Sequence, residues 1–466
     1  MTDTTPGIVA STAVPTIRLR EKLSYAVGDL GSNLVYVPIS TFALFYFTNV
    51  AGIGAAIAGT VLLAGQLLNG LTDLIIGYLI DKTKSRWGKA RPWVLWTAVP
   101  LAVAFVAMFS VPTALDETGR VVWALVAYTL VTAVFFTASN VAYSALMSVM
   151  TSSSRTRVTL TTLRFFAALL TGLIVAVVTL PLVEAFGGGS GGWTAAMSLY
   201  AFFTVITLVT VFFGTRERVV PARDEDSSVR QPLRVLASSL VRNKYFFMVA
   251  GLFLMFYLTT SLTSAGGVYL ATDVLGDASL FGILSAAQLL PPLVTIGFMP
   301  TLISRFGKRR MFLLGTLVMF IGTAVVLLDP QNVPLVIGSA VVRGLGMVPL
   351  TAGIFALVGD VVDYGEWKFG VRTDGLMYSS VVFGQKVGSG LGGAVGGWLL
   401  ASGGYSAAAA TQSADAVQAI LAVSFYVPLA AIFVMGVLIW FIRVEKHAPE
   451  VQAYLSRHVT PQDADA

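Results

Sequence analysis

The chain has 466 residues, of which 56% are hydrophobic and 12% are charged, and its mean hydropathy is +0.80. Soluble domains carry about a quarter charged residues and disordered chains are less hydrophobic, so both classes are excluded. There is no cysteine, and the two histidines, His447 and His458, lie in a polar C-terminal segment. Thiol, zinc and serine–histidine catalysis therefore have no residues within the apolar segments. We expect an all-α polytopic membrane protein that is not an enzyme and needs no cofactor.

Twelve apolar runs are long enough to span a membrane, which takes about 20 residues each. They lie roughly at 23–48, 53–80, 93–112, 121–149, 159–184, 193–214, 245–270, 278–304, 311–328, 334–359, 375–402 and 417–442. The residues ahead of the first run are polar and lack a basic segment followed by an apolar core, so we do not expect a signal peptide.

The longest polar interruption, at 215–244, divides the twelve spans into six and six. The predicted parts are an N-terminal cytoplasmic tail (1–22), a six-helix half (23–214), a central cytoplasmic loop (215–244), a second six-helix half (245–443) and a C-terminal cytoplasmic tail (444–466). Two six-helix halves with a solute site between them at the membrane midplane describe the major facilitator fold. A weak repeat supports this division, because Gly77–Arg91 and Leu302–Arg310 are short basic turns at the same place in each half. The alternative is that every cytoplasmic turn is basic.

The basic residues follow the predicted topology. Of the thirty lysines and arginines, 26 fall in the tails and even-numbered loops, three lie inside spans, and Arg120 alone lies in an odd-numbered loop. The positive-inside rule then places both termini in the cytoplasm, for a multi-pass protein of the cell inner (plasma) membrane. Topology thus explains the net charge of +6, and no nucleic-acid partner is needed. We expect the partners to be the lipid bilayer, a small-molecule solute and a cation, and we expect a working monomer.

Apart from Glu184 at the last position of the fifth span, five charged residues lie inside the predicted spans: Asp29, Asp73, Arg164, Arg343 and Lys386. Each costs roughly 3 kcal/mol at the centre of a membrane helix, and such residues usually mark a solute or ion path. The alternative is an ion pair that locks two helices together. Both explanations stay open for Asp29, and we favour a structural role for Arg343.

Asp73 and Lys386 come from different halves, and each has small or polar neighbours at helical spacing. We predict that they form a charge pair across a central cavity. A carboxylate there can take a proton or a metal cation, and its change of environment would couple cation movement to solute movement. The alternative for Lys386 is a purely packing role.

Several motifs resemble one known family. Lys22–Tyr25 opens the first span, Ser85–Trp93 follows the second, Arg164–Ala167 lies in the fifth, and Asp360–Lys368 precedes the eleventh. Over nearly the whole chain these segments resemble the glycoside–pentoside–hexuronide:cation symporters of the major facilitator superfamily, the group of the bacterial melibiose carrier. The resemblance implies cation-coupled symport of a sugar, glycoside or hexuronide by alternating access.

The resemblance also implies a cation site. Asp73 and Lys386 match the acid of helix 2 and the lysine of helix 11 in the family, while Asn69 stands where the melibiose carrier has a second acid and Thr72 precedes the retained one. One carboxylate suffices for a proton, whereas a metal cation favours more oxygen ligands and more charge. We therefore predict proton coupling over sodium coupling, with Na⁺ at Asp73 and Asn69 as the alternative.

The implied solute site includes Arg164 and Lys386, with Asn33 and Asn140 in place of two family acids and Tyr143 as a stacking face. The two amides can hydrogen-bond hydroxyl groups but cannot make charge-assisted bonds. With fewer acids facing the two basic groups, an anionic sugar such as a hexuronide fits beside neutral sugars. The alternative is a carrier of the same fold that works as a uniporter or takes a non-sugar solute.

A cytoplasmic gate is the last prediction. The basic residues after helix 2 are expected to meet acids near the start of helix 11 at the inner face. These residues are Arg86, Lys89 and Arg91 on one side and Asp360, Asp363 and Glu366 on the other. Their ion pairs would close the cytoplasmic side and break on inward opening. The alternative is a solvated basic loop that only fixes topology.

Overall fold

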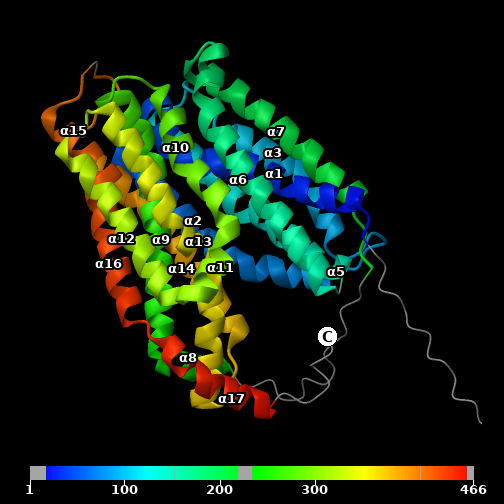
Figure 1. Ribbon diagram of the computed structural model, residues 1–466. Coiled ribbons are helices and arrows are strands. Elements are labelled where there is room, and N and C mark those ends of the chain that lie inside the picture. Colours follow the sequence, from blue (N-terminus) through cyan, green and yellow to red (C-terminus); the bar gives the residue numbers. More distant parts are fainter. Residues whose placement is uncertain (1–16, 152, 219–232, 410, 459–466) are drawn as a thin grey trace, which may run out of the picture.

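The computed structural model describes residues 17–151, 153–218, 233–409 and 411–458, and these are built from helices and short connections without a strand (Figure 1). Parts of the predicted tails and central loop (1–16, 219–232 and 459–466) lie outside the described residues.

The six N-terminal spans are formed by seven α-helices. They are α1 (Leu19–Phe45), α2 (Ala55–Lys82), α3 (Arg91–Met108), α4 (Glu117–Thr129) joined through the π-turn η2 (Leu130–Phe136) to α5 (Thr137–Met150), α6 (Ser154–Ala185) and α7 (Gly189–Gly214). Asp116 begins α4 as a helix cap, because its side chain accepts a hydrogen bond from the backbone amide of Gly119.

The C-terminal spans follow the same scheme after a short helix α8 (Leu233–Arg242). They are α9 (Lys244–Tyr269), α10 (Leu280–Thr295) continuing into α11 (Met299–Phe306), α12 (Lys308–Val325), α13 (Val333–Phe369), α14 (Asp374–Ser402), and α15 (Ala414–Leu421) joined through η6 (Ala422–Tyr426) to α16 (Val427–Phe441). The helix α17 (Ala448–His458) lies beyond them.

Within the described residues, eleven helical segments are long and apolar enough to cross a membrane. The remaining predicted span is α14, a helix of 29 residues whose many glycines, together with Lys386 and Gln385, lower its hydropathy. The prediction of an all-helical major facilitator fold with twelve transmembrane helices is confirmed. One boundary was wrong: the tenth span was expected to end at 359, but α13 continues to Phe369, so the acidic segment that follows is helical.

The two basic turns repeat a local arrangement in each half. Gly88 and Gly307 both adopt positive φ angles, of 103° and 85°; Gly88 lies three residues before α3 and Gly307 immediately before α12. The Glu217 carboxylate accepts hydrogen bonds from the backbone amides that start α3, and Glu445 does the same at the start of α12. A carboxylate at a helix N-terminus is stabilised by the free amides and the helix dipole. The internal repeat therefore extends from the sequence to this capping.

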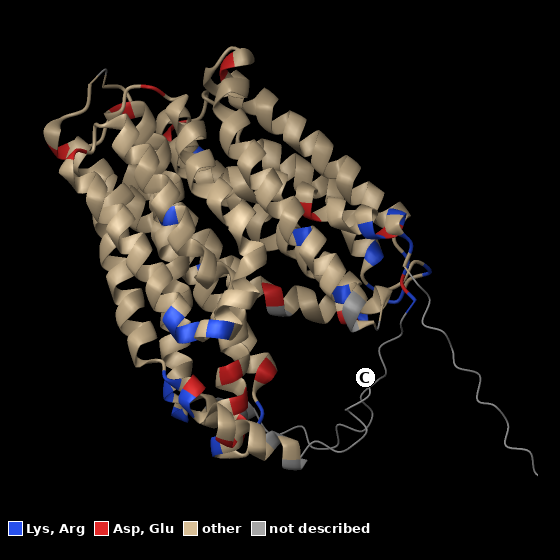
Figure 2. Ribbon diagram, viewed as in Figure 1, with Lys and Arg blue, Asp and Glu red and all other residues tan. Residues whose placement is uncertain are grey.

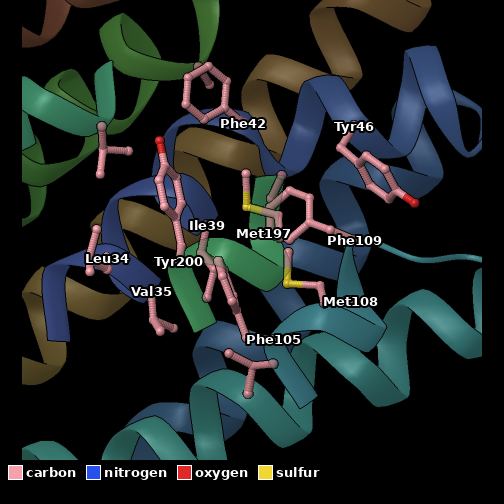
Figure 3. Packing of buried hydrophobic residues seen from close by; sticks show 14 of the residues in the cluster. Leu34, Val35, Ile39, Phe42, Tyr46, Phe105, Met108, Phe109, Met197 and Tyr200 are labelled. Carbon is pink, nitrogen blue, oxygen red and sulfur yellow. The ribbon is translucent and has the colours of Figure 1, made fainter. Parts of the chain in front are cut away.

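Buried aromatic and sulfur-containing side chains fill the N-terminal half between α1, α3 and α7 (Figure 3). Phe42, Tyr46, Phe105 and Phe109 are fully buried, and the Tyr46 hydroxyl accepts a hydrogen bond of 3.0 Å from the backbone amide of Val111. In a membrane, close packing and satisfied polar groups hold helices together because the lipid is as apolar as the core.

The halves meet along α2 and α14, α1 and α9, and α6 and α10. At one end, which we call the joined end, hydrogen bonds connect them: Thr41 with Ser264 (2.9 Å), Thr48 with Tyr269 (2.7 Å) and Asn49 with Tyr405 (2.8 Å). Toward the opposite end, which carries the turns at Gly88 and Gly307 and which we call the basic end, the ribbons of the halves diverge (Figure 1). Lysines and arginines gather at this end (Figure 2).

The contact between α2 and α14 depends on glycines. A Cβ atom on Gly397 would collide with the backbone carbonyl of Ala55 and lie 2.9 Å from the Cα atom of Gly59. Small residues of this kind let two membrane helices approach closely.

We predict that Gly397→Ala separates α2 from α14 and destabilises the protein by about 1–3 kcal/mol, the range for overpacked sites. Gly338→Ala in α13 is the matched control, because a Cβ atom there meets nothing within 4 Å and alanine favours a helix. The measurement is the melting temperature of the purified protein in detergent. It should fall for Gly397→Ala and stay the same or rise for Gly338→Ala; equal temperatures for the two variants would contradict the glycine contact.

Candidate functional site

A cavity of about 720 Å³, which we call the central cavity, lies between the two halves. Its lining combines amide, hydroxyl and charged side chains with aromatic rings. The polar members are Ser32, Asn33, Gln66, Asn69, Asp73, Thr137, Asn140, Ser144, Arg164, Gln385, Lys386 and Ser389, and the aromatic members are Tyr36, Phe136, Phe165, Tyr257 and Phe355. Asp73 is the one carboxylate among these lining residues.

Lys386 on α14 reaches across the central cavity to α2. Its Nζ atom lies 2.5 Å from the Asp73 Oδ2 atom, 2.8 Å from the Asn69 Oδ1 atom and 3.1 Å from the Asn69 carbonyl oxygen. An ammonium group has three donors, so these acceptors satisfy it fully. Both charged side chains stay partly accessible from the cavity, at 17% for Lys386 and 28% for Asp73. The structure thus brings together the acid and the amine of opposite halves.

Asn69 orients this ion pair. Its Oδ1 atom also accepts a hydrogen bond of 2.7 Å from Thr137, and its Nδ2 atom donates to Gln66 at 3.1 Å. The side chain is therefore fixed on both sides. Thr72 is not among the residues that line the central cavity; its hydroxyl donates to the Asn69 carbonyl at 3.1 Å. Thr72 acts on Lys386 only through that carbonyl.

Thr137 is a site residue that sequence reasoning missed. The signal was its spacing of three and seven residues ahead of Asn140 and Ser144, which places all three on one face of α5.

Arg164 on α6 is paired within its own half. Its Nη2 and Nε atoms donate to the Asp29 Oδ1 atom at 3.1 and 3.3 Å, and its Nη1 atom donates to the Tyr25 hydroxyl at 3.3 Å. The guanidinium group also lies 4.5 Å from the centre of the Tyr143 ring. Arg164 thus has a carboxylate partner, as Lys386 has in its predicted pair with Asp73. For Asp29, the structure shows the helix-locking ion pair.

Tyr143 does not line the central cavity, contrary to prediction. Its side chain is fully buried, stacked on Tyr25 with ring centres 4.8 Å apart, and its hydroxyl donates to the Tyr25 carbonyl at 2.6 Å. Helical periodicity gave the correct face of α5 but not the arginine that covers the ring. The cavity obtains its aromatic faces from Tyr36, which stacks on Phe136 at 5.8 Å, and from Tyr257.

Asn33 and Asn140 do line the central cavity. The Asn33 amide nitrogen donates to the Asp29 carbonyl at 2.7 Å, and the Asn140 Oδ1 atom accepts a hydrogen bond from Ser144 at 3.4 Å. Each amide therefore keeps donors or acceptors for a solute in the cavity.

The predicted gate pairs are replaced by contacts within each half. Lys89 pairs with Asp81 at 2.9 Å, the Arg91 guanidinium donates to the Phe212 carbonyl at 2.6 Å, and Arg86 lies over the Trp87 ring. The physical reason is the divergence of the halves at the basic end, which leaves the N-terminal turn to residues of its own half.

The acidic partners of the predicted gate are equally occupied. Asp360 pairs with Lys308 at 2.6 Å, while Asp363 and Glu366 pair with Arg372 at 3.1 and 2.7 Å. Partial burial lowers the pKa of Arg372, but hydrogen bonds to Glu366 and Asp374 outweigh it and raise the pKa above its ordinary value. The predicted contacts to the N-terminal turn are not formed in this arrangement.

Comparison with known proteins gives consistent matches along the chain. Residues 24–446 match the family model described as MFS/sugar transport protein. The isoprimeverose transporter of Lactiplantibacillus pentosus is 34% identical over 95% of this chain and 92% of its own length. The glucuronide carrier protein homolog of Escherichia coli K12 is 30% identical, covering 91% of this chain and 92% of the relative.

Solved structures share the fold. The nucleoside transporter NupG superposes with a TM-score of 0.61 at 16% identity, covering 90% of this chain and 98% of that one. A structure of proton dependent oligopeptide transporters gives a TM-score of 0.66 at 13% identity, over 92% of this chain and 100% of that one.

We predict that Arg164→Gln destabilises the protein by about 3–5 kcal/mol, because it leaves a buried Asp29 carboxylate without its partner. The double variant Asp29→Asn/Arg164→Gln should lose less than the sum of the two single variants, since it removes both charges. The measurement is a double-mutant cycle on unfolding in detergent. The exposed pair Lys89–Asp81 is the control and should contribute about 0–1 kcal/mol. Additive losses at Asp29 and Arg164 would show that the ion pair is not coupled.

Proposed function

Because the chain belongs to the MFS/sugar transport protein family, and is therefore a multi-pass membrane transporter and not an enzyme, we propose that it is a symporter that couples a sugar, glycoside or hexuronide to a proton. The observation that carries the proposal is the ion pair of Asp73 and Lys386, which joins the two halves inside the central cavity. Relatives named for isoprimeverose and glucuronide support the class of solute.

The lining of the central cavity supports a sugar. Its volume of about 720 Å³ lies within the range of small-molecule sites, roughly 300–1,000 Å³. Asn33, Asn140 and Gln385 offer amides that both donate to and accept from hydroxyl groups. Tyr36 and Tyr257 offer ring faces for the apolar side of a sugar.

Coupling follows from the contacts of Lys386. Protonation of Asp73 removes the charge that holds the ammonium group at 2.5 Å. The freed Nζ atom then donates to a solute oxygen, which competes with Asp73 for the same donor. Solute and proton thereby favour each other's binding, and thermodynamic linkage makes this effect reciprocal.

A proton fits this site better than sodium. The Asn69 Oδ1 atom already accepts from Lys386 and Thr137, so a sodium ion would have to displace the ammonium group and remain beside it. A single carboxylate then offers a metal cation little charge. Asp73 and Asn69 remain the residues that would hold Na⁺ if a sodium gradient drives transport.

The arrangement supports alternating access with the cavity open toward the basic end. By the positive-inside rule this end and both termini face the cytoplasm, in the plasma membrane. The described arrangement is then the inward-facing one. The closed arrangement would exchange the present partners of the gate residues for contacts between halves. The solute site and the proton site lie within one chain, so a monomer can carry out transport.

We predict that the reconstituted protein accumulates its solute when a gradient is imposed and that Asp73→Asn and Lys386→Ala abolish this accumulation. Moving one charge through ~100 mV supplies ~2.3 kcal/mol, which corresponds to on the order of fifty-fold accumulation. The measurement is uptake into liposomes of isoprimeverose, glucuronides and other glycosides under separate proton and sodium gradients. The variants should only equilibrate the solute.

Lys82→Ala and Lys84→Ala are the controls, because both residues are exposed, at the end of α2 and just beyond it. Their accumulation should equal that of the unaltered protein. Uphill uptake by Asp73→Asn or Lys386→Ala would overturn the mechanism, and uptake that no gradient enhances would indicate a uniporter.

The orientation gives an independent prediction. Because the chain has no cysteine, single cysteines can be labelled without background. A membrane-impermeant thiol reagent added to intact cells should label Glu117→Cys, which is predicted to lie outside. The same reagent should label Lys84→Cys only after the membrane is permeabilised. Both positions are exposed to solvent. Labelling of Lys84→Cys in intact cells would reverse the assigned topology.

A further inference from the structure

A smaller cavity of about 190 Å³, which we call the Arg343 cavity, lies between the halves next to the central cavity. On α1, Tyr36 lines the central cavity, whereas Ser40 and Thr41, about one turn farther toward the joined end, line this one. The Arg343 cavity is also lined by Ser264 of α9, whose hydroxyl bonds to Thr41. It therefore lies where the two halves are closed against each other.

Arg343 of α13 faces this cavity without a counter-charge. Its side chain is only 8% exposed, and its Nε atom is buried with no hydrogen-bond partner. Among the described residues, its one directed contact is the ring of Phe425, 5.5 Å from the guanidinium carbon. A buried cation that lacks both a counter-charge and hydrogen bonds is strongly destabilised.

The other two basic residues of the spans differ from Arg343. Arg164 is paired with Asp29 and Lys386 with Asp73. The residues that line the Arg343 cavity include no carboxylate at all. No residue that lines the cavity therefore neutralises the positive charge of Arg343, and a molecule bound in the cavity would have to do so.

A second buried group points to the same place. The Ser424 Oγ atom lines the Arg343 cavity, is fully buried and has no hydrogen-bond partner among the described residues. Gln288 and Ser285 of α10 add amide and hydroxyl donors to the lining. A cation with several neutral donors around one small space is the chemistry that binds an anion.

We propose that the Arg343 cavity is an anion-binding site that holds one small monovalent anion between the guanidinium group of Arg343 and the hydroxyl of Ser424. A water molecule occupies about 30 Å³ of liquid, so the cavity has room for a chloride or a carboxylate group with a few waters. The anion comes either from solution or from the carboxylate of an acidic solute. It neutralises the interface where the halves are closed and stabilises this arrangement.

The test is anion binding to the purified full-length protein in detergent, with chloride and acetate as probes. The reference at equal ionic strength is 2-(N-morpholino)ethanesulfonate, a bulky monovalent sulfonate without a carboxylate. Chloride or acetate should raise the melting temperature in a saturable way, and radiolabelled chloride should bind with one site per chain. Arg343→Gln should abolish both effects. Arg309→Gln, at the basic end on α12, is the matched control and should leave them unchanged.

Ser424→Ala keeps the cation and removes one donor. It should weaken anion binding about tenfold, the size expected for a hydrogen bond to a charged group. Because Arg343→Gln can fail to fold, Ser424→Ala and the unaltered protein keep the test decisive.

Glucose and glucuronate distinguish the two sources of the anion. Stabilisation by glucuronate but not by glucose, chloride or acetate, lost in Ser424→Ala, would assign the site to the carboxylate of the solute. Saturable binding of chloride or acetate would assign it to a free anion. If none of chloride, acetate and glucuronate stabilises the protein more than the sulfonate reference, or if Ser424→Ala and Arg343→Gln bind them unchanged, the proposal is wrong.

Discussion

The ion pair of Asp73 and Lys386 connects the two halves inside the central cavity, which both halves line. Charged groups inside a membrane are tolerated only when they are paired or reach water, so the acid of α2 and the amine of α14 depend on each other. Asn69 completes the coordination of the ammonium group, and Thr137 holds the Asn69 side chain in place by donating a hydrogen bond to its Oδ1 atom. Any group that takes Asp73 away from Lys386, whether a proton or a solute, must therefore change how the halves are held together.

The helix packing at the joined end and the helix capping at the basic end both allow the halves to move about the central ion pair. Glycines let α2 and α14 pack backbone to backbone near Gly397, which brings their polar faces within reach farther along the same helices. At the basic end, Glu217 and Glu445 tie the basic turn of each half to the end of its own last helix. Each half thus holds its own charges at that end, and the described contacts between the halves include those of the joined end and the central pair. That division is what rigid-body movement of two halves needs.

Sequence predicted the fold and the central pair, because hydrophobic length, basic loops and rare intramembrane charges are signals that depend on the bilayer itself. It failed where a prediction needed the partner of a side chain. Asp29 and Arg164 lie on helices far apart in the chain, and periodicity gives a face but no neighbour. Tyr143 is on the expected helix but beneath Arg164. The gate pairs across the halves stay a prediction, because their ion pairs are expected to break when the cytoplasmic side opens. Thr137 and the solitary charge of Arg343 became interpretable only from contacts.

The central claim is that a bound solute and Asp73 compete for Lys386, so that solute binding draws a proton onto Asp73. The most direct measurement is the number of protons taken up from a weakly buffered solution at neutral pH when the purified protein binds its solute. We expect proton uptake on solute binding, up to about one proton per solute because one carboxylate is involved, since the coupling of proton and solute is reciprocal. We expect none for Asp73→Asn, which already lacks the charge. Equal proton uptake by both proteins, or solute binding to the unaltered protein without proton uptake, would contradict the account.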